Sequence, residues 1–89
     1  MMSEEELFLQ QIGQRIMERR KKLGLTQEAL AEKGDVTTQF VSYAEAGKRA
    51  MRPENLLKIA SALGVSTDYI LTGDIIDKDH LLLSEKCVN

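Results

Sequence analysis

The segment from residue 26 to residue 49, TQEALAEKGDVTTQFVSYAEAGKR, constrains the fold more than any other part of the chain. Thr26 and Thr37 each stand immediately before a short helical pattern, and a glycine follows the second pattern. A threonine at such a position accepts a hydrogen bond from a free N–H group of the helix, and a glycine ends a helix by adopting positive φ. We therefore predict helices over about residues 27–33 and 38–46, joined by a tight turn.

The outer face of the second helix carries side chains that are polar but uncharged. Apolar positions expected to hold the two helices together are Leu30, Val36, Val41 and Ala44, with the small Ala31 at the crossing. The side chains left on the outer face are Thr38, Gln39, Ser42 and Tyr43. Hydroxyls and amides donate and accept hydrogen bonds, as the base edges in a DNA major groove require, and an α-helix fits that groove. An ordinary solvated face is the alternative, although such a face usually carries Lys and Glu.

The charges are unevenly distributed along the chain. The formal net charge is −2, which is not typical of a DNA-binding protein. Between Arg15 and Lys58, however, ten Lys or Arg stand against six Asp or Glu, and both flanking regions are acidic. The distribution matters more than the total for nucleic-acid binding, so the centre of the chain remains a candidate for phosphate contact, with ordinary charge scatter as the alternative.

Length and composition indicate one small all-helical domain. The chain has 89 residues, 43% hydrophobic and only 4% aromatic, with a single Pro and no Trp. Three further helices are expected: one from a Ser3–Glu6 capping box to Gly24, one from Pro53 to Gly64, and one from Ser66 to Gly73. The apolar row of the N-terminal helix is Phe8, Ile12, Ile16 and Leu23, with Arg20 on the same row. The apolar row of the helix that begins at Pro53 is Leu56, Ile59, Ala60 and Leu63.

The central segment resembles the helix-turn-helix of the phage-repressor and Cro-like (Xre-type) family of bacterial regulators. The matching residues are Gln27, Leu30-Ala31, Val36, Val41-Ser42, Glu45 and Gly47-Lys48-Arg49, and the resemblance extends over about residues 12–73. It implies a compact five-helix, lambda-repressor-like DNA-binding domain at residues 1–73, followed by an extra helix or tail at 74–89. The turn departs from the family, because Gly34-Asp35 replaces an apolar residue and a glycine. Aspartate tolerates positive φ better than most residues, but Gly34 would leave a packing position empty.

The residues and the resemblance together suggest how DNA would be contacted. The expected base-contacting residues are Gln27, Thr38, Gln39, Ser42 and Tyr43. The expected phosphate-contacting residues are Thr37, Lys48, Arg49 and Arg52, the last three in the loop that lies on the DNA backbone in the family. The resemblance also implies a structural ion pair between Arg20 and Glu45. Gln27 has three possible partners: a base edge, a phosphate, or the side chain of Gln39.

The leading hypothesis is a sequence-specific transcriptional regulator, most simply a repressor, that binds double-stranded DNA as a homodimer at an inverted repeat. The alternative is a protein-interaction module such as an antitoxin or an assembly subunit. No Ser-His-Asp set, metal-spaced cluster or phosphate-binding glycine loop is evident, so we expect neither an enzyme nor a cofactor.

In the tail, Asp77 would cap a helix that carries Leu81, Leu82, Leu83 and Val88. This helix would pack on its own domain or on a second chain, and we favour the second chain. His80 and Cys87 are interpreted as ordinary tail residues. The acidic N-terminal region and the absence of a long apolar run predict a cytoplasmic location.

Overall fold

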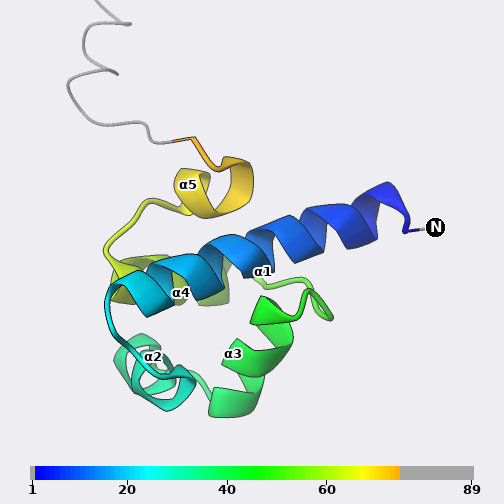
Figure 1. Ribbon diagram of the computed structural model, residues 1–89. Helices are drawn as coiled ribbons and strands as arrows, with labels where there is room; N and C mark the ends of the chain where they lie inside the picture. The colour runs from blue at the N-terminus through cyan, green and yellow to red at the C-terminus, as the bar shows by residue number, and fades with distance from the viewer. Residues whose placement is uncertain (1, 75–89) are drawn as a thin grey trace, which may run out of the picture.

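The computed structural model describes residues 2–74, and over that range the chain forms a bundle of five helices (Figure 1). The helices are α1 (Glu4–Lys22), α2 (Gln27–Gly34), α3 (Thr38–Glu45), α4 (Pro53–Leu63) and α5 (Thr67–Thr72). The described residues contain no strand, so the expected all-helical, five-helix architecture is confirmed. None of these helices combines the length and hydrophobicity needed to cross a membrane. The candidate dimerisation helix beyond Asp74 lies outside the described residues.

The helices begin where the sequence predicts: short hydroxyl side chains cap four of them, and Pro53 stands at the start of α4, which has no side-chain cap. Ser3 and Glu6 form the reciprocal capping box at the start of α1. Thr26, Thr37 and Ser66 each accept a hydrogen bond of 3.0 Å from the backbone N–H three residues later, at the starts of α2, α3 and α5. Each cap satisfies one of the N–H groups that a helix leaves without an internal partner.

The hydrophobic core lies between the five helices, with α1 packed against α3, α4 and α5, and α2 packed against α3 and α4. Its ten buried apolar side chains are Ile12, Ile16, Leu30, Ala31, Val41, Ala44, Ile59, Ala60, Leu63 and Ile70. The predicted stripe on α4 is buried as expected, with Leu56 partly buried at its start. Because α2 and α3 each contribute two residues to this core, their relative position is fixed by packing as well as by the turn between them.

Two residues of the predicted α1 row are not in the core. Phe8 is 45% exposed and Leu23 is 42% exposed. The N-terminal turns of α1 extend beyond the other helices, so Phe8 has little surface to pack against (Figure 1). Leu23 is the C-cap of α1 and stays exposed at the end of the helix. The prediction was correct for Ile12, Ile16 and Arg20, but wrong for these two residues.

Arginines on α1 bind the C-terminal ends of other helices. Arg15 donates hydrogen bonds of 2.9 and 3.0 Å to the carbonyl oxygens of Ile70 and Leu71 in α5. Arg19 donates one of 3.0 Å to the carbonyl oxygen of Leu63 at the end of α4. Carbonyl groups in the last turn of a helix lack internal partners, and a cation there also interacts favourably with the helix dipole. The sequence did not indicate this role of Arg15 and Arg19.

Candidate nucleic-acid interface

The turn between α2 and α3 keeps a tight geometry despite its unusual sequence. Asp35 follows α2 with φ 55° and ψ 47°, and it is the only non-glycine residue of positive φ in the described chain. Asp35 therefore occupies the left-handed position that the family fills with glycine, and the N–H of Val36 donates to the carbonyl oxygen of Ala31 at 3.0 Å. Gly34, the last residue of α2, is buried, and a Cβ atom on it would lie 3.5 Å from the Cδ1 atom of Ile59. The position expected to be empty is thus partly filled by α4.

Close contact between α1 and the end of α3 positions the second helix of the pair. A Cβ atom on Gly13 would collide with the carbonyl oxygens of Ala44 and Glu45, so the backbones of α1 and α3 touch at this point. Gly47 follows α3 with φ 71°, and its Cβ would lie 2.8 Å from the Cα atom of Gln10. Only glycine fits where two backbones approach this closely. Gly13 was missed in the sequence, although a glycine inside a helical pattern is a recognised sign of close packing.

The expected ion pair between Arg20 and Glu45 is present. The Nε atom of Arg20 donates to Glu45 Oε2 at 2.6 Å and its Nη2 donates to Oε1 at 3.0 Å. The two side chains are only 11% and 4% exposed. The hydrogen bond to Glu45 raises the pKa of Arg20 above its already high value, so the guanidinium remains charged at any pH used for binding assays. This pair ties α1 to the C-terminal end of α3.

Gln27, at the first position of α2, joins the same network. Its Nε2 atom donates to Glu45 Oε1 at 3.1 Å, which links the start of α2 to the end of α3. The side-chain bridge considered between Gln27 and Gln39 is not formed. One N–H group and the carbonyl oxygen of the half-buried Gln27 amide remain without a hydrogen bond to the described residues.

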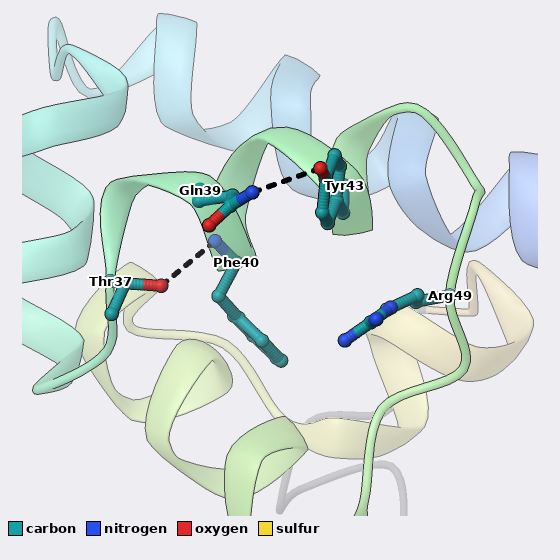
Figure 2. A pocket seen from close by; sticks show the side chains of 5 residues that line it. All are labelled: Thr37, Gln39, Phe40, Tyr43 and Arg49. Atoms are coloured by element: carbon teal, nitrogen blue, oxygen red, sulfur yellow. Dashed lines mark hydrogen bonds between the residues drawn. The ribbon is translucent and has the colours of Figure 1, made fainter.

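The outer face of α3 presents the polar side chains identified in the sequence. Gln39 is exposed, whereas Thr38, Ser42 and Tyr43 are half-buried. Gln39 Nε2 donates to the hydroxyl oxygen of Tyr43 at 2.9 Å, and Figure 2 shows the two side chains facing each other one helical turn apart. Neither side chain is packed into the core, so the outward-facing orientation required for reading DNA is preserved.

A hollow of about 260 Å³ lies beside this pair, lined by Thr37, Gln39, Phe40, Tyr43 and Arg49 (Figure 2). Phe40 was not singled out in the sequence, yet it is half-buried and packs against the core from this side. The guanidinium carbon of Arg49 lies 5.7 Å from the centre of the Tyr43 ring, within the range of a cation–π interaction. Residues of α3 and of the loop that follows it therefore line the same hollow.

That loop carries the basic side chains expected near phosphate. Lys48, Arg49 and Arg52 are all exposed, and none of them forms an ion pair within residues 2–74. In the same range no group of three His, Cys, Asp or Glu side chains is placed to hold a metal ion. The surface around α3 thus combines uncharged hydrogen-bonding groups with unneutralised positive charge.

A family model described as helix-turn-helix matches residues 16–70, more than half of the chain. The chain belongs to the helix-turn-helix family. The helix-turn-helix itself is the pair α2 and α3, with α3 in the position of the recognition helix. Among relatives, the chain is 41% identical over 66 residues to repressor protein C2 of Salmonella phage P22 and 37% identical over 69 residues to the HTH-type transcriptional regulator ImmR of Bacillus subtilis. These matches cover 74% and 78% of this chain but only 31% and 54% of the relatives, so the chain spans about half of their length or less.

Solved structures of helix-turn-helix proteins have the same fold. The P22 c2 repressor in complex with the synthetic operator 9T matches with a TM-score of 0.70 and 42% identity, covering 73% of this chain and 98% of that one. The restriction-modification controller protein C.AhdI of Aeromonas hydrophila matches with a TM-score of 0.68 and 35% identity, covering 70% of this chain and 94% of that one. The family and these relatives support a DNA-binding transcriptional regulator.

Proposed function

We propose that this protein is a sequence-specific transcriptional repressor that inserts α3 into the major groove of double-stranded DNA. The observation that carries the proposal is the exposed Gln39 on the outer face of α3, followed by a loop in which Lys48, Arg49 and Arg52 are exposed and form no ion pair within the described residues. A helix with this pattern offers donors and acceptors to base edges, and adjacent cations attract the DNA backbone.

Base reading is assigned to Gln39 first. A glutamine amide makes two hydrogen bonds to the major-groove edge of adenine, and such a contact contributes about 1–3 kcal/mol of discrimination against other bases. Thr38 and Ser42 are half-buried beside it and would make shorter-range contacts through their hydroxyl groups. Gln27 would contact a base or a phosphate with the groups that Glu45 leaves available.

Phosphate binding is assigned to the loop after α3 and to the start of that helix. Lys48, Arg49 and Arg52 would neutralise phosphates without distinguishing sequences, and so fix the orientation of α3 in the groove. Thr37 is exposed, and its hydroxyl oxygen already accepts a hydrogen bond from Phe40 N–H, so its O–H group would donate a hydrogen bond to a phosphate oxygen.

The proposed target is an inverted repeat bound by a homodimer. Two copies of α3 related by a two-fold axis would enter successive major grooves about 34 Å apart, which requires half-sites centred about one helical turn apart. The P22 c2 repressor, whose structure holds a synthetic operator, supports DNA as the partner. Selection of binding sites from random DNA tests whether the protein prefers one sequence and whether that sequence is an inverted repeat, because the recovered sequences reveal the half-site and its symmetry.

Two substitutions separate base reading from phosphate binding. Gln39→Ala should reduce base preference at one position of each half-site and leave the fold intact. Lys48→Ala should weaken binding to all sequences alike and reduce the slope of log affinity against log salt by about 0.9, since one phosphate contact is lost. Gln14→Ala and Lys58→Ala, on α1 and α4, provide exposed controls of matched chemistry. Identical effects of Gln39→Ala and Lys48→Ala on every sequence would contradict this division of roles.

The alternative is a protein-interaction module without sequence-specific DNA binding. Exposed apolar side chains near the start of α1, Met2, Leu7 and Phe8, are consistent with a protein partner. A gel-shift assay at moderate salt with competitor DNA distinguishes the two functions. Binding that disappears, or that ignores sequence, would favour the interaction module over the repressor.

A further inference from the structure

We infer that Tyr43 is a positioning residue, which holds the base-reading amide of Gln39 with its hydroxyl group and the phosphate-binding guanidinium of Arg49 with its ring. This inference rests on the proposed function. It changes the role expected for Tyr43 from the sequence, where it was a candidate for direct base contact.

The hydroxyl group restricts the orientation of the Gln39 amide. Gln39 Nε2 donates one of its two hydrogens to the Tyr43 hydroxyl at 2.9 Å, with the residues at positions i and i+4 of α3. One N–H group and the carbonyl oxygen of the amide then remain available to a ligand. These are the donor and acceptor that match N7 and N6 of adenine in the major groove. The hydrogen bond therefore leaves the reading edge of Gln39 open while it reduces the freedom of an otherwise exposed side chain.

The aromatic ring of the same residue restricts Arg49. Arg49 belongs to the loop after α3 and is exposed, so no helix fixes its side chain. Its guanidinium carbon lies 5.7 Å from the centre of the Tyr43 ring. Among the described residues this is the one cation–π contact, and it connects the loop to the reading face of α3. Tyr43 is itself half-buried and lines the hollow beside Phe40, so it provides a firmer support than a freely rotating side chain.

Ordering a long side chain before binding lowers the entropic cost of the complex. The cost of immobilising one such side chain corresponds to a factor of about two to ten in affinity. If the Tyr43 hydroxyl orders the Gln39 side chain in the free protein, removing the hydroxyl should change affinity only through the base that Gln39 reads. If the Tyr43 ring orders the Arg49 side chain, removing the ring should change affinity for every sequence alike.

Two substitutions of Tyr43 separate the hydroxyl from the ring. Tyr43→Phe removes the hydroxyl but keeps the ring under Arg49, whereas Tyr43→Leu removes both. Affinities are measured for the selected half-site and for all single-base variants of it, with Gln39→Ala and the double variant Gln39→Ala/Tyr43→Phe as references. Urea denaturation of each variant confirms that it remains folded.

We expect Tyr43→Phe to reduce discrimination by about two- to tenfold, only at the base pair affected by Gln39→Ala, with the salt dependence unchanged. The double variant should discriminate no less than Gln39→Ala alone, because the hydroxyl acts through Gln39. Tyr43→Leu should additionally weaken binding to all sequences, and adding Arg49→Ala to it should cost less than Arg49→Ala costs in the wild-type protein.

Three results would overturn the inference. Unchanged discrimination in Tyr43→Phe would show that the hydroxyl does not position Gln39, and lost discrimination at a different base pair would show that Tyr43 reads a base directly. Side-chain amide signals of Gln39 in NMR spectra of the free protein give a readout without DNA, and signals that do not move in Tyr43→Phe would show that the hydrogen bond is absent in solution. A wild-type protein without sequence preference would instead refute the proposed function, so the two failures are distinguishable.

Discussion

Replacing Glu45 by alanine should destabilise this domain more than any exposed substitution. The change removes both acceptors of the Arg20 guanidinium, at 2.6 and 3.0 Å, and the acceptor of Gln27 at 3.1 Å. Arg20 keeps a single hydrogen bond of 2.8 Å, to the carbonyl oxygen of Leu25, and is left as a buried charge without a hydrogen-bonded counter-ion. Breaking a buried pair in this way costs about 3–5 kcal/mol. A chain of 89 residues has a total stability of about 4–13 kcal/mol, so the loss is a large part of it.

Urea denaturation followed by far-UV circular dichroism measures this loss. With an m-value of about 1–2 kcal/mol/M for a small domain, the midpoint should fall by about 1.5–5 M. Glu18→Ala is the matched control, because Glu18 is exposed on α1 and forms no ion pair within the described chain. Glu45→Gln should lose less than Glu45→Ala, since the amide oxygen still accepts a hydrogen bond. A loss below about 1 kcal/mol for Glu45→Ala, equal to that of the control, would refute the argument that burial makes this pair indispensable.

Three glycine-related substitutions test the backbone geometry, each by the same denaturation assay. Gly13→Ala should lower the free energy of unfolding by about 1–3 kcal/mol, because the new methyl group collides with backbone carbonyl oxygens of α3 and forces α1 away. Retention of full stability would show that α1 and α3 are not in backbone contact. Gly34→Ala should stabilise by about 0.5–1 kcal/mol, because its methyl group meets Ile59 at an ordinary 3.5 Å and alanine favours a helix; a loss would mean that the space is already filled. Asp35→Gly should raise the free energy of unfolding by a few tenths to about 1 kcal/mol, because glycine adopts positive φ at lower cost than aspartate. The substitution removes only a weak, exposed contact to Lys58. A destabilised variant would show that the aspartate side chain itself supports the turn.

The helices could be predicted from the sequence because their signals are local. Thr26, Thr37 and Ser66 stand at their caps as predicted, and the α4 stripe is buried, because capping and hydrophobic periodicity depend on neighbours within a few residues. Phe8 was misplaced for the opposite reason. Periodicity indicates which face of a helix is apolar, but not how far the partner helices extend along it.

The candidate site was predictable in its residue types but not in its internal connections. Gln39 and Tyr43 were selected for their chemistry, yet their mutual hydrogen bond depends on side-chain conformation. The bond from Gln27 to Glu45 joins residues 18 positions apart, and it could be drawn only once α2 and α3 were placed. The pair of Arg20 with Glu45 was accessible earlier only because the family resemblance supplied it. How DNA engages these residues stays a prediction.

The arginines of α1 have a consequence for how the domain comes apart. Arg15 holds the end of α5, Arg19 holds the end of α4, and Arg20 holds both Glu45 and the carbonyl oxygen of Leu25. Detaching α1 would break all of these bonds together, and detaching α4 or α5 alone would break the bonds from Arg19 or Arg15. Partial opening at these contacts is therefore penalised, and amide protons in the core-packed turns of α1, α3, α4 and α5 should exchange with solvent chiefly through cooperative, global unfolding.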